Sequence, residues 1–432
     1  MNIAILGYGV EGKSIERFFN SDNITIFDHF RPEEVPSLPL SDFDLVFRSP
    51  SVRPPLEFLK NPPKNWTSST NYFFTHCPCP IIGVTGTKGK GTTCSLIAAL
   101  LNGLNYNTHL VGNIGTPALD ALNYIKNSDV VIYEMSSFQL WDLQKSPHIA
   151  VVLRIEPDHL DVHYDFDDYR NAKSNIIRHQ SPDDTCIFYG HNPNSLKIAS
   201  LSPAKNQLPY PYFDLISLPK SQRNDTISLL YHTLDNLSIK GAHNQENAVA
   251  ALTAVSAFLS LPLFDFIKKY NDIITQVFKD FQGLPHRIEY IRTLENIDFY
   301  DDNYSSAFPA LDVAISAFID RPVFLIAGGK DRHLDLTKTI HRLNSAQNLT
   351  KIFLIGETNH ALAAGLPSVK FELHDTLPDA VTAAFTAAKA LLQKDPSSTT
   401  PVVLMSPGAA SFDMFKNFSD RGEKFQKIVK DL

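Results

Sequence analysis

Residues 81–95 have the sequence Ile-Ile-Gly-Val-Thr-Gly-Thr-Lys-Gly-Lys-Gly-Thr-Thr-Cys-Ser, and the rest of the chain is organised around them. The first five residues suit a buried strand, because all but one are apolar or β-branched. The glycine-rich turn leads into residues 95–100, whose composition suits a helix. Backbone amides and the helix dipole at such a junction hold phosphates. The stretch therefore predicts a phosphate-binding loop.

The loop departs from the usual phosphate-loop pattern in two places. Val84 stands where that pattern has its first glycine, and Gly91 separates Lys90 from the hydroxyls of Thr92 and Thr93. A glycine-rich turn alone is a weak signal, because loop glycines mostly serve positive φ angles. The strand before and the helix after favour a phosphate site over a plain turn. Lys90 would reach the β/γ-phosphates, and a following hydroxyl would bind Mg²⁺.

Length and charge restrict the classes of protein that fit. The 432 residues suggest two or three domains, and the net charge of −7 offers no broad basic face for nucleic acid or an anionic membrane. The apolar residues 3–6 are interrupted at once by glycines and charges, which argues against a signal peptide or membrane span. We expect a cytoplasmic monomer whose four cysteines are reduced.

The N-terminus has the pattern of a nucleotide-binding fold. A strand is predicted over residues 2–8, and its last two residues begin the motif Gly7-Tyr8-Gly9-Val10-Glu11-Gly12. A second strand is predicted over residues 24–27 and is followed by Asp28. This G-x-G-x-x-G pattern favours a dinucleotide site and hence a nicotinamide-dependent oxidoreductase. The crevice could equally hold a UDP group, and the glycines could serve helix packing alone. No hydride-transfer site follows in the chain.

A third strand, residues 44–47, leads to Ser49 at its carboxyl end, where ligands bind in open α/β sheets. Five prolines within residues 50–63 favour an extended loop over a helix. The first domain is expected to end between Phe74 and Pro80.

From residue 81 strands and helices continue to alternate, which predicts a mostly parallel sheet. Strands are expected at residues 108–111, 130–133 and 150–153. Glu134 directly follows one of them beside the phosphate loop, which favours a Mg²⁺ ligand over a solvated or capping acid. By chemistry alone, His159 is more often structural, and Lys173 in a helical stretch is an ordinary surface lysine.

The later part of this region is less regular. Residues 203–219, with their prolines, predict an irregular excursion, and residues 227–232 and 237–239 around Asp235-Asn236 suggest a hairpin. A long alanine-rich helix follows over residues 241–259. Asn244 and Asn247 share a helical face that could contact an adenine, although helix capping explains Asn244 equally well.

A third αβ series predicts a C-terminal domain of typical size, with helices near residues 307–318 and 378–393. Its strands are expected at residues 287–291, 297–301, 323–327, 351–355 and 402–405.

Along nearly its whole length the chain resembles the Mur ligases, because several separate motifs arrive in the family's order. It is most similar to the members that add D-glutamate to UDP-N-acetylmuramoyl-L-alanine in peptidoglycan synthesis. The motifs are residues 86–93, 112–115, 134–139, 158–161, 172–173, 243–247, 283–287 and 406–422. Folylpolyglutamate synthases share Lys90-Gly91-Thr92, but the N-terminal unit and residues 411–418 argue against them.

The resemblance implies an α/β protein with a UDP-substrate domain (residues 1–79), a central ATPase (80–285) and a C-terminal Rossmann-like domain for the amino acid (286–432). ATP would phosphorylate the substrate's terminal carboxylate, and the amine of D-glutamate would attack the acyl phosphate. Mg²⁺ at two sites would assist. A non-catalytic nucleotide-binding protein, or a ligase for L-glutamate, remains an alternative.

The resemblance also implies roles for individual residues. Catalysis would use Lys90, Glu134, His159 and Lys173. Metal ions would be held by Thr92, Glu134, His159 and, if it is carbamylated, Lys173. ATP would contact Gly86, Thr87, Lys88, Gly89, Lys90, Gly91, Thr92, Thr93, Asn244, Asn247, Arg287 and Asp302. The UDP-substrate would contact Gly9, Val10, Glu11, Asp28, Ser49, Asn113, Ser136 and Gln139; the amino acid would contact Arg332, Ser306, Ser411 and Phe418.

Three positions depart from the family's pattern. Tyr304 stands where the family has an active-site lysine, and Arg332 where it has a lysine for the amino acid's α-carboxylate. Arg154 replaces a usual asparagine. An arginine can still pair with a carboxylate, through a planar fork. These departures bear on the identity of the amino acid more than on the reaction class.

Overall fold

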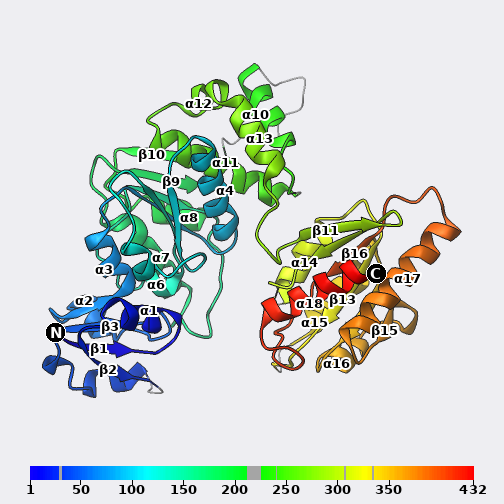
Figure 1. Ribbon diagram of the computed structural model, residues 1–432, viewed down its shortest axis with the longest axis horizontal. Coiled ribbons are helices and arrows are strands. Elements are labelled where there is room, and N and C mark those ends of the chain that lie inside the picture. The colour runs from blue at the N-terminus through cyan, green and yellow to red at the C-terminus, as the bar shows by residue number, and fades with distance from the viewer. Residues whose placement is uncertain (29–31, 212–224, 240, 306–307, 333–334) are drawn as a thin grey trace. The chain divides into compact units, whose positions relative to one another are not determined.

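The computed structural model describes residues 1–28, 32–211, 225–239, 241–305, 308–332 and 335–432. The chain divides into two compact units, Met1–Phe281 and Gln282–Leu432. The first unit contains two sheets and the second contains one, and many of their elements are labelled in Figure 1. Both sheets of the first unit are parallel throughout, which confirms the predicted α/β class.

The N-terminal part of the first unit is a four-stranded sheet with the order β2-β1-β3-β4. Its strands are β1 (Asn2–Leu6), β2 (Asn23–Phe27), β3 (Leu45–Arg48) and β4 (Trp66–Ser68), and its helices are α1 (Val10–Phe18), α2 (Leu56–Lys60) and α3 (Ser69–His76). Helix α2 corrects the prediction of an extended loop over residues 50–63. The helix starts directly after Pro55, a position that needs no backbone N–H donor. Three of the five prolines precede the helix and two follow it, so none interrupts it.

The central part is a six-stranded sheet with the order β10-β9-β8-β5-β7-β6, so β5 lies at its middle between β7 and β8. Its strands are β5 (Ile81–Thr85), β6 (Thr108–Gly112), β7 (Val130–Glu134), β8 (Ile149–Val152), β9 (Thr185–Tyr189) and β10 (Asn206–Tyr210). Its helices are α4 (Lys90–Gly103), α5 (Ala118–Leu122), α6 (Ser137–Leu140), α7 (Phe166–Arg178), α8 (Pro193–Ala199), α10 (Asp225–Asp235), α11 (Ala242–Phe258), α12 (Leu263–Lys269) and α13 (Asn271–Asp280).

Two predictions for this region were wrong. Residues 206–210 form the edge strand β10 instead of an irregular excursion, and residues 225–235 form helix α10 instead of a hairpin strand. Leu230, Leu234 and Leu237 recur at helical spacing and pack into the core. A helix therefore buries these side chains on one face, which explains why a helix forms here and not a hairpin strand. The remainder of the predicted excursion, residues 212–219, lies outside the described residues.

The two faces of the central sheet bury alternate residues of each strand. Ile82 and Val84 pack in the core formed with helices α4 and α10–α13, whereas Ile81 and Tyr133 face the opposite side. This second core also contains Ile3, Ile5 and Phe47 of the N-terminal sheet. One continuous core therefore joins the N-terminal and central parts, which explains why they form one compact unit.

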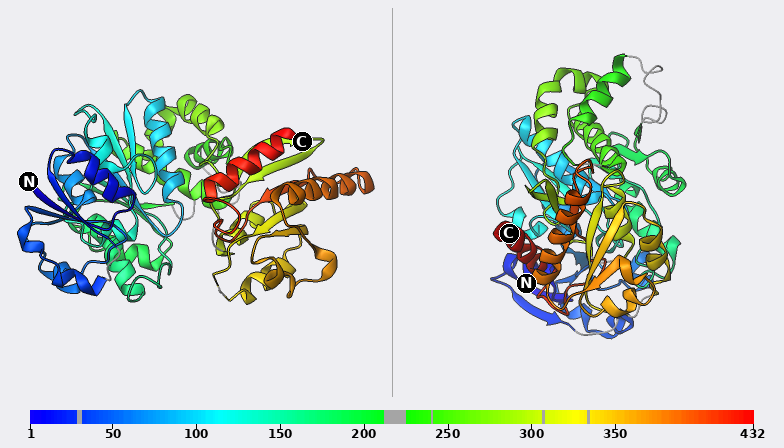
Figure 2. Two further views of the ribbon diagram at one scale, coloured as in Figure 1. Left: turned by 60° about the horizontal axis from the view of Figure 1, so that its bottom comes forward. Right: turned by 90° about the vertical axis from the view of Figure 1, so that its right-hand side faces the viewer.

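The second unit is a six-stranded sheet with the order β11-β12-β16-β13-β14-β15, in which only the pair β11–β12 is antiparallel among the described strands. In Figure 2, α17 and α18 lie along one face of this sheet and α14–α16 cover the other. The strands are β11 (Glu289–Leu294), β12 (Ile297–Asp301), β13 (Val323–Gly328), β14 (Leu349–Ile355), β15 (Phe371–Leu373) and β16 (Val402–Met405). The helices are α14 (Phe308–Ser316), α15 (Thr337–Ser345), α16 (Asn359–Ala363), α17 (Leu377–Lys394) and α18 (Phe418–Asp431).

One sheet falls within each of the ranges 1–79, 80–285 and 286–432, and the division into these three domains stays a prediction. Within the described part of the chain, no single helix has the length and apolarity to cross a membrane. The pair α11 and α12, bent by 92°, meets those criteria only when taken together.

The glycines of the N-terminal motif have different structural roles. Gly7 has a φ of +84°, which forms the turn after β1. A Cβ on Gly12 would lie 2.5 Å from the carbonyl oxygen of Gly7, so only glycine lets α1 approach the turn. A Cβ on Gly9 would meet nothing within 4 Å. Packing therefore accounts for Gly7 and Gly12, and Gly9 is left available to a ligand.

We expect Gly12→Ala to lower the free energy of unfolding by about 1–3 kcal/mol, because the methyl group overlaps backbone. Gly9→Ala, the matched control, should cost less than about 1 kcal/mol. Chemical denaturation of the two variants measures both effects. Equal losses of stability in the two variants would contradict this assignment of roles.

Candidate active site

The predicted phosphate loop connects the central strand β5 to α4. Gly89 precedes α4 with a φ of +86°, and a Cβ there would lie 2.3 Å from Asn247 Oδ1. The Lys90 side chain folds back over the loop, where its Nζ donates to the carbonyl oxygens of Gly86 (3.1 Å) and Thr87 (3.2 Å). Thr92 is half-buried behind it, and Lys88 is exposed. The structure thus places all residues of the motif 86–93 in one loop and helix start.

The segment that follows β8 holds the loop from one side. The N–H of Thr87 donates to the Arg154 carbonyl oxygen (2.9 Å), and its hydroxyl donates to the Glu156 carbonyl oxygen (2.9 Å). The same hydroxyl lies 3.0 Å from the hydroxyl of Tyr169 on α7. These contacts fix the loop before any ligand binds, and Tyr169 is a contributor that sequence reasoning missed.

Lys173 lies directly beneath the loop. It projects from α7 with 1% of its surface exposed, and its Nζ donates to the Gly86 carbonyl oxygen (2.9 Å) and to Thr85 Oγ1 (3.3 Å). Burial, and then the nearby Lys90 ammonium, lower the pKa of Lys173 well below its ordinary value. The surface-lysine interpretation is therefore wrong for Lys173.

Glu134 ends β7 beside the loop, as predicted, with 2% of its surface exposed. Its Oε1 accepts a hydrogen bond from Asn113 Nδ2 (3.2 Å). Its Oε2 is buried and has no hydrogen-bond partner among the residues that the structure describes. A buried carboxylate oxygen without a partner is costly, so Glu134 fits a bound cation.

His159 lies in the loop after β8 with a φ of +54°, and its ring lies 5.0 Å from that of Phe138. Burial lowers its pKa. Within the described ranges, three His, Cys, Asp or Glu ligand atoms come within 4.8 Å of one another only at His286, Glu289 and Asp301, in the second unit. Glu134 and His159 therefore belong to no such ready-made cluster. A metal at either residue would need its remaining ligands from other groups, such as Thr92, Lys173 or a bound nucleotide.

Asn244 and Asn247 lie at the start of α11, and Asn247 is buried against the phosphate loop. Asn247 Oδ1 accepts a hydrogen bond from Thr93 Oγ1 (3.4 Å), and its Nδ2 donates to Asn244 Oδ1 (3.4 Å). The structure brings this pair to the loop, and their contact with an adenine stays a prediction.

Most of the residues predicted for the UDP-substrate lie at the carboxyl end of the N-terminal sheet and at the adjoining α6, whereas Asn113 follows β6 of the central sheet and contacts Glu134. Gly9 and Val10 are exposed at the start of α1, and Asp28 Oδ1 accepts from the Tyr8 N–H (3.3 Å). Buried Ser49 donates to the Gly7 carbonyl oxygen (2.5 Å). Gly9, Val10, Asp28 and Ser49 therefore lie around the turn that follows β1.

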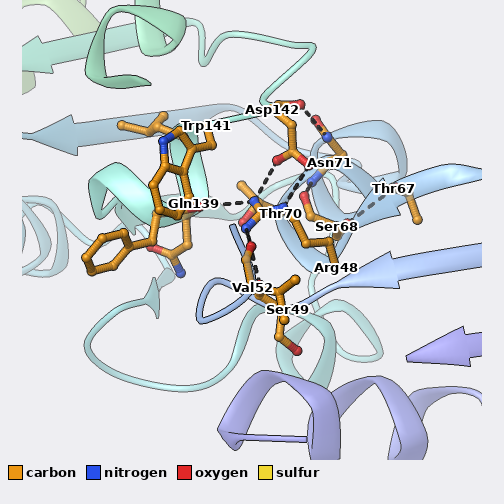
Figure 3. A network of polar contacts seen from close by, with 12 residues as sticks. Arg48, Ser49, Val52, Thr67, Ser68, Thr70, Asn71, Gln139, Trp141 and Asp142 are labelled. Carbon is orange, nitrogen blue, oxygen red and sulfur yellow. Dashed lines mark hydrogen bonds and ion pairs between the residues drawn. The ribbon is translucent and has the colours of Figure 1, made fainter. Parts of the chain in front are cut away.

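Glu11 connects this turn to α6. Gln139 Nε2 donates to Glu11 Oε1 (2.7 Å), Ser69 Oγ donates to Glu11 Oε2, and burial raises the pKa of Glu11. Gln139 Oε1 in turn accepts from the N–H of Ser136 (2.9 Å), which caps α6. The sequence motifs did not reveal the neighbouring contact between Arg48 and Asp142, shown in Figure 3. An arginine that ends an apolar strand was its only signal.

In the second unit, Asp302 lies at the carboxyl end of β12. It is 4% exposed and accepts hydrogen bonds from Ser406 Oγ (2.7 Å), from Ser305 Oγ (2.5 Å) and from the Ile288 N–H (3.2 Å). Burial raises the pKa of Asp302 to about 7. This carboxyl group therefore changes charge near neutral pH.

Beside Asp302, an aromatic cluster surrounds the family departure at Tyr304. The Arg287 guanidinium lies 3.8 Å from the centroid of the Tyr304 ring, which in turn contacts the ring of Phe418 at 5.2 Å. Arg287 Nε is buried and lacks a hydrogen-bond partner in the described part of the chain. The tyrosine thus positions an arginine that retains an unused donor.

The remaining residues predicted for the amino acid lie near the carboxyl ends of β13 and β16. Ser411 is buried, whereas Arg332 is exposed and lines a small cleft with Lys330 and Gly408. Ser306 lies outside the described residues. A groove of ≈ 750 Å³ lies between α17 and strands β14 and β15. Its lining includes Thr350 and Lys351 and contains none of the described residues that were predicted for the amino acid.

A phosphate loop at the middle of a parallel sheet, flanked by a buried acid and a buried lysine, defines a nucleotide-binding α/β protein. The family model of the Mur ligase middle domain matches residues 84–255. The UDP-N-acetylmuramoylalanine–D-glutamate ligase of Clostridium tetani is 31% identical over 400 residues, which cover 91% of this chain and 84% of that protein.

The corresponding ligase of Acetivibrio thermocellus is 33% identical over 415 residues, with the same 91% and 84% coverage. The solved structure of the UDP-N-acetylmuramate-alanine ligase MurC from Thermotoga maritima matches with a TM-score of 0.59 at 16% identity, covering 100% of this chain and 99% of that one. That likeness is one of fold. The chain belongs to the Mur ligase family.

We expect the raised pKa of Asp302 to make folding stability depend on pH. Between the unfolded pKa near 4 and the folded value of about 7, the folded carboxyl keeps a proton that the unfolded chain releases, so stability falls as pH rises. Asp302→Asn should abolish this loss, which is on the order of a few kcal/mol between pH 5 and pH 8.

Denaturant titration at the two pH values measures the difference, with exposed Asp431→Asn as the matched control. The other groups that titrate in this range, such as His286, are common to all three proteins. An equal loss of stability in the wild type and Asp302→Asn would refute the assigned pKa.

Proposed function

We propose that this chain is an ATP-dependent, ADP-forming ligase that joins D-glutamate to UDP-N-acetylmuramoyl-L-alanine in peptidoglycan precursor synthesis. The observation that carries the proposal is the phosphate loop, in which Lys90 and Lys173 converge on one carbonyl oxygen and Glu134 offers an unpartnered carboxylate oxygen. Relatives about a third identical over most of both chains carry the corresponding name. The reaction runs through an acyl phosphate on the substrate.

Lys90 and the backbone amides of the loop bind the transferred phosphoryl group and offset its charge. Thr92 and Glu134 would hold Mg²⁺, and His159 a second ion. Bound Mg²⁺ supplies further charge neutralisation at the phosphate oxygens. The buried setting of Glu134 keeps water away from this carboxylate and strengthens its interaction with any cation.

Lys173 is proposed to carry a carbamate. Its lowered pKa leaves the amine neutral at lower pH than an ordinary lysine, and a neutral amine adds to carbon dioxide with loss of one proton. The product is a carboxylate beneath the loop, where its negative charge would offset that of the nearby Lys90 ammonium. This carboxylate would support the ion assigned to His159.

The UDP-substrate is proposed to bind along Gly9, Ser49 and Gln139. The Gln139 oxygen accepts from Ser136 and one Nε2 hydrogen is donated to Glu11, so only the second Nε2 hydrogen could reach the substrate without an exchange of partners. Asn113 is exposed and donates one of its amide hydrogens to Glu134. The amine of the incoming amino acid attacks the acyl phosphate, gives up a proton and displaces phosphate.

The amino acid is proposed to bind at Arg332, Ser411 and Phe418 in the second unit. Arg332 supplies a planar fork for a carboxylate in place of the family's lysine. Tyr304 supplies an aromatic ring in place of a charge, and Arg287 behind it restores a cation to the same cluster. The arginine pair is therefore compatible with an acidic amino acid.

The proposal predicts phosphate release from ATP in the presence of UDP-N-acetylmuramoyl-L-alanine and D-glutamate. Lys90→Ala should lower kcat/KM by about 100-fold or more, because one preorganised donor to the phosphoryl group is lost. Exposed Lys197→Ala is the matched control and should leave the rate unchanged. A colorimetric phosphate assay, with the peptide product identified by mass spectrometry, measures both.

The comparison includes L-glutamate and a blank without amino acid. Phosphate release only with L-glutamate would support the proposed mechanism but show that the enzyme is specific for L-glutamate and not for D-glutamate. No product with any amino acid, from folded protein that binds ATP, would contradict the ligase proposal.

The carbamate on Lys173 predicts a specific signal. With isotopically labelled bicarbonate, carbon nuclear magnetic resonance should show a carbamate in the wild type and in Lys197→Met, and none in Lys173→Met. The signal should weaken as pH falls, because protonation of the amine removes the reactive form. Its absence from nucleotide-bound wild type at mildly alkaline pH would exclude the modification.

A further inference from the structure

Arg48 ends strand β3 at the first unit's N-terminal sheet, after the apolar residues Leu45, Val46 and Phe47. It has 0% of its surface exposed, and it is among the largest fully buried side chains of the described residues. A buried guanidinium is tolerated only when its charge and its donors are all matched. The partners of Arg48 therefore show what its burial achieves.

All five N–H groups of the guanidinium are used. Nε donates to Asp142 Oδ2 (2.8 Å) and Nη2 to Asp142 Oδ1 (2.6 Å), which is a bidentate pair. Nη2 also donates to the Phe138 carbonyl oxygen (3.0 Å), and Nη1 donates to the carbonyl oxygens of Ser49 (3.2 Å) and Val52 (3.0 Å). Figure 3 shows this network.

Asp142 is itself fixed from the N-terminal part. Its Oδ2 accepts a second hydrogen bond from Trp66 Nε1 (2.9 Å), and its backbone oxygen accepts one from Asn71 Nδ2 (2.8 Å). Asn71 Oδ1 in turn accepts from the Gln144 N–H (2.8 Å). The contact therefore leaves little freedom for Arg48 to shift.

The two sides of the network belong to different parts of the proposed substrate site. Ser49 and Val52 form the turn after β3, which packs against Gly7 of the nucleotide-binding motif. Phe138 lies on α6, the short helix that also carries Gln139 and begins beside Ser136. Arg48 is the link that fixes the turn to the helix.

We propose that Arg48 is a positioning residue for the UDP-substrate, which holds the turn 49–52 at a fixed distance from α6. This inference rests on the proposed function of the same site. Three of its five hydrogen bonds go to backbone carbonyl oxygens of the turn and the helix, which an apolar side chain cannot hold. A lysine has three donors and no planar fork, so it cannot replace all five.

The test separates positioning from stability. Arg48→Met alone leaves Asp142 as a buried charge without its cation, so the double variant Arg48→Met/Asp142→Leu is the informative one. We expect this variant to stay folded with a lowered melting temperature, because the carbonyl oxygens of Ser49, Val52 and Phe138 lose their donor. Its KM for UDP-N-acetylmuramoyl-L-alanine should rise about tenfold or more, with kcat nearly unchanged and the KM for ATP within about threefold.

Arg48→Lys should raise the same KM by a smaller factor, because it keeps the charge and part of the hydrogen bonding. Arg17→Met is the matched control: Arg17 also pairs across the two parts, with Asp120 (2.5 Å), but its side chain is 55% exposed. Its KM values should stay within about twofold of the wild type, as expected for an exposed ion pair.

A folded double variant with an unchanged KM for the UDP-substrate would overturn the inference, and so would a parallel rise in the KM for ATP. Calorimetric titration with UDP distinguishes this from a failure of the proposed function. If the wild type itself does not bind UDP, the proposed function and this inference fall together. If the wild type and the double variant bind UDP and the substrate equally well, only the inference falls.

Discussion

The phosphate loop depends on two amines that share one acceptor. Lys90 Nζ and Lys173 Nζ both donate to the carbonyl oxygen of Gly86, and their mutual repulsion adds to burial in lowering the pKa of Lys173. The Lys90 ammonium and the N-terminus of α4 give the loop a positive potential that a bound anion offsets. Thr87 and Asn247 hold the loop in shape, so the potential is present before a ligand arrives. Phosphate binding is therefore a consequence of packing as well as of glycine content.

Within the first unit, packing and hydrogen bonds also fix the N-terminal sheet, with its turn 49–52, against the central sheet. The core that covers one face of the central sheet includes Ile3, Ile5 and Phe47, so the N-terminal sheet is built onto the central sheet and not merely linked to it. At the edge of this core, polar contacts replace apolar ones: Glu11 meets Gln139, and Arg48 meets Asp142. Apolar packing brings the two parts together without direction. The hydrogen bonds then fix their register, because each has a preferred distance and angle.

Local patterns predicted most of the strands, because buried parallel strands are short apolar runs whose ends carry glycine or polar residues, but they missed β4, β9, β10 and β15. They failed where tertiary packing decided: the turn residues Asp235 and Asn236 suggested a hairpin, yet Leu230 and Leu234 needed a helical face to reach the core. At the site, contiguous motifs identified the loop and Glu134. The contact of Arg48 with Asp142 joins residues 94 positions apart, and no local pattern records such a pairing.

Among the described residues, the buried charge of Arg48 differs in its pairing from three other buried charged groups. Arg48 has every donor matched, so its charge has nothing further to bind and serves geometry alone. Glu134 Oε2 and Arg287 Nε are buried without a hydrogen-bond partner among the described residues, and Asp302 is buried at the cost of a raised pKa. Each of these groups would be destabilising in a finished core. A ligand that supplied the missing partners of Glu134 and Arg287 would explain why these two groups persist.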